Sequence, residues 1–126
     1  MAKQKVHAVD FDATLVEDYK KDGAEFDPAK AGDPVLDMVE RVKTWLDLGE
    51  EVVIFTARVA PSHPESEIAL SKATIEEFCV REFGTKLEVT CIKHPEFSDF
   101  WDDKAVRVDR DKGSVSDQSD VEDPLK

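Results

Sequence analysis

The stretch VHAVDFDATL, residues 6–15, places two aspartates, Asp10 and Asp12, directly after a short apolar run. Such a run, without polar alternation, is typical of a parallel strand that is buried on both faces. Ligands of open α/β sheets bind outside the carboxyl ends of the strands, and buried carboxylates are costly unless they are paired or bind a cation. The stretch therefore indicates a metal or reaction site, although Asp-x-Asp also occurs in the solvated loops of acidic proteins.

The composition is that of a single domain. A chain of 126 residues with 40% hydrophobic residues can bury one core, and it contains no apolar run long enough to cross a membrane. Residues 1–5 lack the apolar stretch of a signal peptide, so we expect a cytoplasmic protein. Cys79 and Cys91 form no Cys-x-x-Cys unit, and we expect two buried, reduced thiols.

The net charge of −12, from 29 acidic and 17 basic residues, argues against an extended nucleic-acid-binding surface. It leaves open a nucleotide, or the end of a nucleic acid, held in a small local site. A negatively charged protein that handles phosphate needs a cation at that site. The composition leaves the oligomeric state open.

The first half of the chain predicts a strand, a flap, a helix and a second strand. The first strand covers about residues 5–10. Residues 15–33 are polar and without a sustained period, so we expect a flap that can cover the two aspartates. Asp33 and Pro34 predict the start of a helix, with Asp33 as its N-cap, and Gly49 predicts its end. Residues 51–55 are continuously apolar after Glu51 and predict a second buried strand.

The second half predicts another helix and several shorter strands. The helix is expected to end at Gly84, and residues 87–91 alternate as a half-exposed strand does. Two further short strands are expected at residues 100–101 and 105–108. Residues 109–126 are acidic and have little to bury, so we expect a disordered tail after a domain of residues 1–108.

Strands that alternate with helices predict an α/β fold, here a three-layer, Rossmann-like parallel sheet without a cap domain. A parallel sheet brings the carboxyl ends of its strands to one edge, and a hydroxyl and a guanidinium at that edge suit phosphate. Six polar residues follow three of the expected strands: Asp10, Asp12, Thr56, Arg58, Asp102 and Asp103.

These residues resemble the motifs of haloacid-dehalogenase-like phosphohydrolases, in the order that the family has them. The first motif is Asp-x-Asp-x-Thr after a hydrophobic strand (residues 10–14), and the second is a threonine that ends the next strand (Thr56). The third is a lone lysine (Lys93), and the fourth is an acidic pair that ends a later strand (residues 102–103). The resemblance spans residues 6–108; its first and fourth motifs are fairly specific, and the other two are weak alone.

The chain departs from the family pattern in three ways. Ala13 stands where the family often has glycine, and the insertions after the first two strands are too short for a cap domain. Small capless members often act on large or polymeric phosphorylated substrates. The link before the acidic pair is shorter than a usual parallel crossover, so Lys104 is a rival to Lys93 for the site lysine.

The resemblance implies a reaction through an aspartyl-phosphate. Asp10 would be the nucleophile, and Asp12 would be the general acid and then the general base. Mg²⁺ prefers oxygen ligands; Asp10, the main-chain carbonyl of Asp12 and Asp103 would hold it, with Asp102 acting through water.

Thr56 and Lys93 would contact the phosphoryl group, and Arg58 would hold the substrate. We therefore expect a magnesium-dependent phosphomonoesterase. A nucleotide, a polynucleotide end and a phosphoprotein are all open as substrates, and the resemblance to small capless members favours a nucleotide or a polynucleotide end. The alternative is a catalytically silent module that keeps the fold and binds or regulates a partner. The acidic tail favours this alternative, whereas the complete set of acids favours the enzyme.

Overall fold

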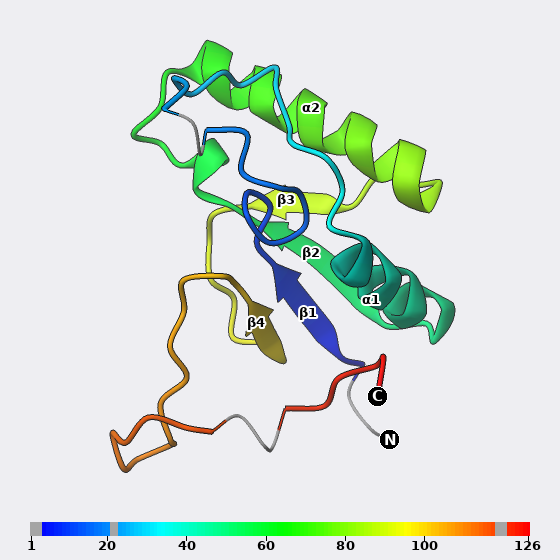
Figure 1. Cartoon of the computed structure of the whole chain (residues 1–126), viewed down its shortest axis with the longest axis vertical. Coiled ribbons are helices and arrows are strands. Elements are labelled where there is room, and N and C mark those ends of the chain that lie inside the picture. The colour runs from blue at the N-terminus through cyan, green and yellow to red at the C-terminus, as the bar shows by residue number, and fades with distance from the viewer. Residues whose placement is uncertain (1–3, 21–22, 118–120) are drawn as a thin grey trace.

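The sheet has four strands, and all of them are parallel. The computed structural model describes residues 4–20, 23–117 and 121–126. The strands are β1 (Val6–Val9), β2 (Glu51–Phe55), β3 (Glu88–Thr90) and β4 (Asp99–Trp101), in the spatial order β3-β2-β1-β4 (Figure 1). This arrangement confirms the predicted α/β fold with a Rossmann-like parallel sheet.

The helices are α1 (Leu36–Asp47) and α2 (Glu65–Phe83), with a short 3-10 helix, η1 (Ala57–Val59), after β2. The prediction that Asp33 and Pro34 start α1 is wrong, because Pro34 instead forms a β-bridge with Val16, which requires extended backbone. The predicted helix end at Gly84 is confirmed. Gly84 adopts a left-handed conformation with φ of 77°, which glycine reaches at little cost.

Both helices lie on the same face of the sheet. The strands β1, β2 and β3 follow one another in a single direction across the sheet. Two right-handed crossovers in the same direction place α1 and α2 on one side of the sheet (Figure 1). The core cluster beneath the helices accordingly takes Val9, Val52 and Ile54 from this face of β1 and β2, whereas Val6, Ala8 and Val53 are buried on the opposite face. The helices cover the first of these faces with Val39, Val42, Trp45, Ile75, Phe78 and Cys79.

Residues 91–98 cover part of the opposite face. They connect β3 to β4, which lies on the far side of the sheet, so this crossover runs the other way. Phe97 from this link packs against Phe55 and Phe100, with ring centroids 6.1 and 5.7 Å apart. The third layer of the expected three-layer arrangement is thus this link, which contains no helix, because so short a segment cannot both cross two strands and form one.

The chain after β4 forms an arm and then returns to the body. Residues 105–117, here called the C-terminal arm, extend beyond the open edge of β4 (Figure 1). The predicted strand at residues 105–108 is wrong, because only Val108 pairs there, in a single bridge with Val115. Asp123 then binds Arg41 through two hydrogen bonds of 2.9 and 2.8 Å, and Glu122 lies 2.8 Å from Lys5. The disorder of the tail stays a prediction. Within the described residues, no helix is long and apolar enough to cross a membrane.

A buried histidine ties β4 to the rest of the sheet. The ring nitrogens of His7 lie 2.8 Å from Asp99 and 2.7 Å from Glu50, and the ring stacks on Trp45. Burial lowers the pKa of His7, but the hydrogen bonds to the two carboxylates outweigh it, and the pKa is raised above 6.5. Only the protonated ring can donate to both carboxylates, so the charged form holds β1, β4 and the α1–β2 turn together.

We expect this histidine to make stability depend on pH. A folded-state pKa above the unfolded value of 6.5 gives stabilisation that is complete below pH 6.5 and is lost as the pH rises through the folded pKa. His7→Gln should therefore be less stable at low pH and show a flatter dependence between about pH 6 and pH 8. Urea unfolding at a series of pH values measures both, with His94→Gln as the control. Parallel pH profiles for the original chain and His7→Gln would contradict the role given to the ring.

Candidate metal and phosphate site

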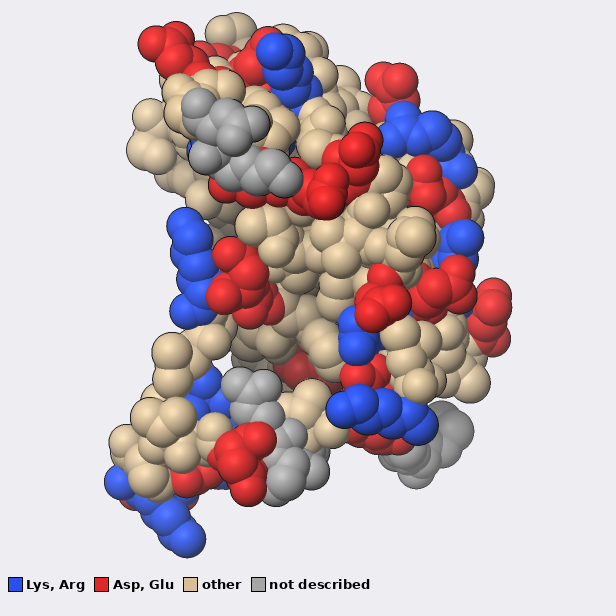
Figure 2. Space-filling model, viewed as in Figure 1, with Lys and Arg blue, Asp and Glu red and all other residues tan. Residues whose placement is uncertain are grey.

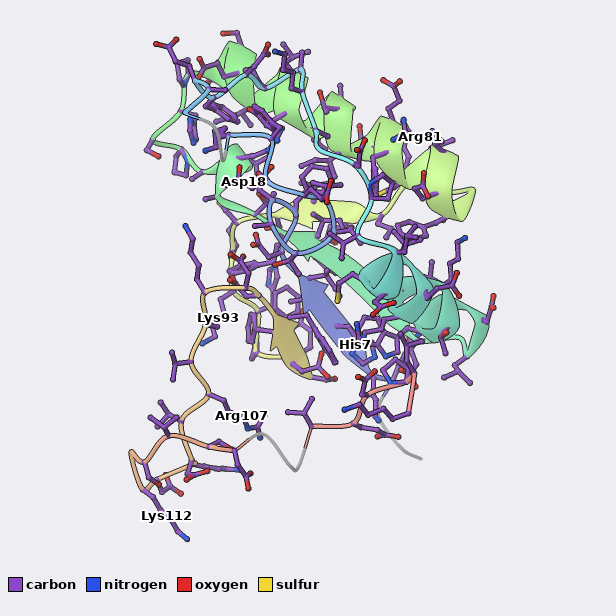
Figure 3. All side chains as sticks on the ribbon, in the orientation of Figure 1. His7, Asp18, Arg81, Lys93, Arg107 and Lys112 are labelled. Carbon is purple, nitrogen blue, oxygen red and sulfur yellow. The ribbon has the colours of Figure 1, made fainter. Side chains whose placement is uncertain are left out.

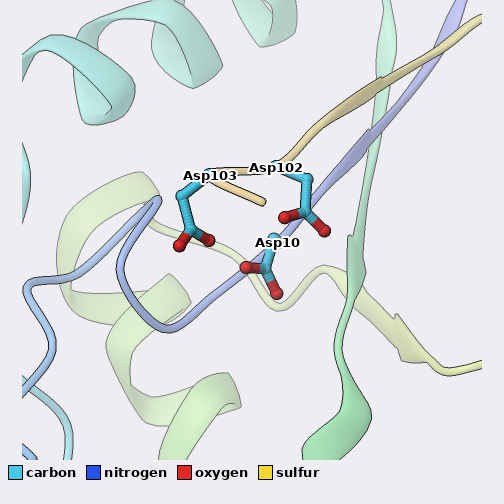
Figure 4. Close-up of side chains that lie close together, drawn as sticks. All are labelled: Asp10, Asp102 and Asp103. Atoms are coloured by element: carbon cyan, nitrogen blue, oxygen red, sulfur yellow. The ribbon is translucent and has the colours of Figure 1, made fainter. Parts of the chain in front are cut away.

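Three carboxylates meet at the carboxyl ends of β1 and β4. The parallel register pairs Val9 with Trp101, so Asp10 after β1 comes to lie beside Asp102 and Asp103 after β4 (Figure 4). One carboxylate oxygen from each of the three residues lies within 4.8 Å of the others. This distance is short enough for a single divalent cation to bridge the three groups after a small movement.

Of the three acids, Asp10 is the one whose ionisation this arrangement disfavours most. Burial, the negative charge of Asp102 and a hydrogen bond with Asp103 together raise the pKa of Asp10 to about 7. Close carboxylates in a poorly hydrated place cannot all ionise cheaply, so one of them retains a proton. A cation between the three residues would remove this cost, because it favours the ionised form of each ligand.

Thr14 fixes the positions of two of these acids. Its hydroxyl oxygen accepts the amide hydrogen of Asp103 at 3.0 Å, and the same hydroxyl lies 3.1 Å from Asp103 Oδ1 and 3.4 Å from Asp10 Oδ2. The tight turn after β1 brings it there, with Ala13 in a left-handed conformation at φ of 66°. The sequence analysis gave Thr14 no role of its own, although it is the last residue of the first motif.

Asp12 is separated from the three acids by a partner of its own. Arg58 donates from Nε and from Nη2 to the two oxygens of Asp12, with both distances 2.7 Å. This is the bidentate geometry in which a planar guanidinium holds a carboxylate most firmly. The carboxylate of Asp12 is therefore committed to Arg58, and only its main-chain carbonyl, the atom implied by the resemblance, remains for a metal.

The Arg58 side chain is only 3% exposed and lies among aromatic rings. Its guanidinium carbon is 5.2 to 5.8 Å from the ring centroids of Phe11, Tyr19 and Phe26. Such contacts, together with the Asp12 pair, make the burial of a guanidinium tolerable. Among the described residues, the third nitrogen, Nη1, is buried and has no hydrogen-bond partner.

Thr56 begins η1 at the end of β2. Its hydroxyl oxygen accepts the amide hydrogen of Arg58 at 3.2 Å, which caps the short helix. A hydroxyl that accepts in this way can still donate its own hydrogen to an anion in the cavity. Thr56 thus lies where the resemblance places a phosphate-binding threonine.

The two candidate lysines lie in different cavities. Lys104 lines the cavity that contains the aspartates and Thr56, whereas Lys93 lines a neighbouring cavity beside β4. Lys93 Nζ lies 5.1 Å from the ring centroid of Phe100, on the face opposite α1 and α2. Of the two, the structure places Lys104 with the carboxylates.

The site cavity has a volume of about 520 Å³, and the flap forms one of its walls. Asp18, Lys20 and Phe26 from the flap line it, together with His63 from the loop before α2. The two ends of the flap lie side by side, because the amide of Glu17 donates to the carbonyl oxygen of Asp33 at 2.7 Å and the backbone of Gly32 lies so close to Glu17 that a Cβ there would collide with the Glu17 carbonyl. The sequence analysis expected the flap near the aspartates but named none of these four lining side chains, because a loop without a period does not show which residues point inward.

The charges in the cavity favour a cation. Five of its lining residues are acidic and three are basic. A phosphate monoester that entered this cavity would add further negative charge, so a divalent cation is needed to balance the whole. Hard carboxylate oxygens are the ligands that Mg²⁺ prefers, and the donor set of Asp10, Asp102 and Asp103 fits it.

Comparison with known proteins supports the fold alone. The chain is similar in structure to a conserved protein from Bacteroides thetaiotaomicron, with a TM-score of 0.53 and 23% identical residues. The match covers 82% of this chain and 79% of that one. No protein-family model and no curated protein matches the chain.

We expect Mg²⁺ to raise the melting temperature of the protein, and to do so more at pH 8 than at pH 5. Below its pKa of about 7, Asp10 holds a proton that competes with the metal. Thr14→Val should weaken Mg²⁺ binding by about tenfold, because the hydroxyl orients Asp103. Thermal unfolding across a Mg²⁺ titration measures both effects.

Thr44→Val is the matched control for this titration, because the Thr44 hydroxyl is exposed and bonds only to Glu40 within its own helix, as far as the described contacts show. A melting temperature insensitive to Mg²⁺ at both pH values would exclude the metal site. Equal Mg²⁺ affinity in Thr14→Val and Thr44→Val would exclude the positioning role of Thr14.

Proposed function

We propose that this chain is a magnesium-dependent phosphomonoesterase of the haloacid-dehalogenase type. One observation carries the proposal: Asp10, at the end of the central strand β1, has a carboxylate oxygen within 4.8 Å of Asp102 and Asp103. A nucleophilic carboxylate beside a metal-binding acid pair is the arrangement that phosphoryl transfer through an aspartyl-phosphate requires. The parallel sheet and the order of the motifs along the chain support the same reading.

The reaction proceeds in two displacements at phosphorus. In the first, an Asp10 oxygen attacks, the bond from phosphorus to the leaving oxygen breaks, and Asp12 gives that oxygen a proton. In the second, Asp12 takes a proton from water, the water oxygen attacks phosphorus, and the bond to Asp10 breaks to release inorganic phosphate. Mg²⁺, when bound by Asp10, Asp102 and Asp103, offsets the negative charge of the phosphoryl oxygens.

Asp12 donates a proton in the first displacement and accepts one in the second, and its pair with Arg58 affects the two steps differently. The pair with Arg58 holds both oxygens of Asp12 as hydrogen-bond acceptors, which suits the second displacement, in which Asp12 takes a proton from water. The first displacement needs a protonated Asp12, so the pair with Arg58 has to open, or Asp12 has to turn, when the substrate enters. Arg58 is therefore a positioning residue for Asp12 in this proposal.

The phosphate-binding groups are those that line the same cavity as Asp10. Thr56 donates its hydroxyl hydrogen to a phosphoryl oxygen, and the ammonium group of Lys104 offsets the charge. This assignment replaces Lys93, which the resemblance gave that role, with Lys104. The buried Nη1 of Arg58 has no hydrogen-bond partner among the described residues, and the kinetics of Arg58→Lys decide whether it binds a phosphoryl oxygen.

Hydrolysis of an aryl phosphate tests the reaction class. We expect turnover with Mg²⁺, none with EDTA, and a loss of about 10³-fold or more in Asp10→Asn, because the amide cannot act as the nucleophile. Asp37→Asn, an exposed acid on α1, is the matched control and should keep full activity. Turnover that survives in EDTA or in Asp10→Asn would exclude this mechanism.

One observation favours the alternative of a catalytically silent module. Both oxygens of Asp12 accept hydrogen bonds from Arg58, so in this arrangement no proton is available to a leaving group. A silent module would bind Mg²⁺ and phosphate without turning over any phosphate ester. If calorimetry detects binding of both Mg²⁺ and phosphate, and no phosphate ester is hydrolysed, the chain is a silent module and not an enzyme.

Arg58→Lys distinguishes a positioning role from direct phosphate binding. Lysine keeps the charge but lacks the fork that orients Asp12, so we expect kcat to fall by about tenfold or more while KM changes little. If Arg58 instead binds the phosphate in the ground state, KM rises and kcat is retained. Steady-state kinetics with the aryl phosphate separates the two outcomes, and Arg41→Lys, on α1, controls for the loss of a bidentate pair, here a partly buried one.

A further inference from the structure

A second cavity of about 570 Å³ borders the site. It lies between β4, the edge strand of the sheet, and the C-terminal arm, where Figure 2 shows a hollow between the arm and the body. Phe55 and Asp102 line both cavities, so the two are neighbours that share a wall. Its volume is in the range of clefts that bind small organic ligands.

The walls of this second cavity are aromatic and its rim is basic. Phe55, Phe100 and Trp101 line it, and Phe100 is 39% exposed. Lys93 comes from the link before β4, and Arg107 comes from the arm. Figure 3 shows both residues on the side of the molecule where the arm lies.

The two acids of the second cavity are already engaged. Asp99 accepts from the indole nitrogen of Trp101 at 3.1 Å and lies 2.8 Å from His7. Asp102 accepts the amide hydrogen of Lys104 at 2.8 Å and belongs to the group of three acids that can hold a metal. An anion that entered this cavity would meet Lys93 and Arg107 beside these two acids, so its binding depends on a cation that offsets the charge of Asp102.

The C-terminal arm is less acidic than the chain as a whole. The net charge of the whole protein is −12, whereas residues 105–117 contain three basic and three acidic residues. Of these three basic residues, Arg107 lines the second cavity, while Lys112 lies at the far end of the arm (Figure 3). A short anionic ligand can bind at Arg107, while the acidic remainder of the surface disfavours a long polyanion.

We propose that the second cavity binds the leaving group of the substrate, and that this leaving group is a nucleoside with a second phosphoryl group. The aromatic walls suit the flat apolar faces of a base, and Lys93 and Arg107 suit the second phosphate. In this proposal the reacting phosphate lies at Asp10. The inference therefore rests on the proposed function for the reaction, whereas ligand binding in the second cavity can be measured independently of it. A nucleoside bisphosphate and the phosphorylated end of an oligonucleotide both carry this ligand chemistry.

Binding to the full chain with Asp10→Asn tests the proposal without turnover. With Mg²⁺ present, we expect adenosine 3′,5′-bisphosphate to bind about tenfold more tightly than adenosine 5′-monophosphate, because its second phosphate gains a charge-assisted contact. In Lys93→Gln/Arg107→Gln this ratio should fall to about twofold. Both side chains are exposed, so the variant should fold.

The matched control is Lys43→Gln/Lys72→Gln, which removes the same charge from exposed positions on α1 and α2 and should keep the tenfold ratio. A 3′-phosphorylated trinucleotide tests the second source. If it binds as tightly as the bisphosphate and depends on Lys93 and Arg107, the site accepts nucleic-acid ends; if only the bisphosphate binds, the ligand is a free nucleotide.

Three outcomes would overturn the proposal. They are equal affinity for the monophosphate and the bisphosphate, an equal loss in the control variant, and tighter binding of a phosphopeptide that also depends on Lys93 and Arg107. Aryl phosphate hydrolysis without a preference for the bisphosphate would remove this inference and leave the proposed function intact. A preference for the bisphosphate without any hydrolysis would leave this inference intact and remove the proposed function.

Discussion

Repulsion between three neighbouring carboxylates is the constraint around which this end of the molecule is built. The parallel register of β1 and β4 leaves no choice about where Asp10 and Asp102 lie, because both follow the last paired residues of their strands. Burial of Asp10 is the largest cause of its raised pKa, and the negative charge of Asp102 adds to it. The hydrogen bonds of Thr14 hold Asp10 and Asp103 close together, which is the arrangement that the proposed Mg²⁺ site requires.

The Arg58–Asp12 pair connects this acidic centre to the flap. Because the guanidinium packs on Tyr19 and Phe26, the orientation of Asp12 depends on the position of the flap. The flap also docks on α2, where Thr74 donates to the carbonyl of Pro28. A ligand that displaced Arg58 from Asp12 would therefore also disturb the contacts of the guanidinium with Tyr19 and Phe26 of the flap.

Features that depend on where a strand ends could be predicted from the sequence, whereas features that tertiary contacts determine could not. The apolar run before Asp10 and the order of strands and helices were enough to predict the parallel sheet and the meeting of Asp10 with the acidic pair. The Arg58–Asp12 pair could not be predicted, because two residues at the ends of different strands can face each other or a ligand equally well. The start of α1 was missed because the bridge between Pro34 and Val16 competes with helix formation, and only the folded chain shows which wins.

The short link between β3 and β4 explains why a second cavity borders the site cavity. Residues 91–98 must cross two strands, so they run close to the sheet and pack Phe97 between Phe55 and Phe100. This path carries Lys93 away from the carboxylates and leaves it over Phe100, beside the edge of the sheet. Lys104, beyond the acidic pair, lines the cavity with the carboxylates, whereas Lys93 lines the second cavity. A longer crossover with a helix would have covered the same aromatic face, and the second cavity would not exist.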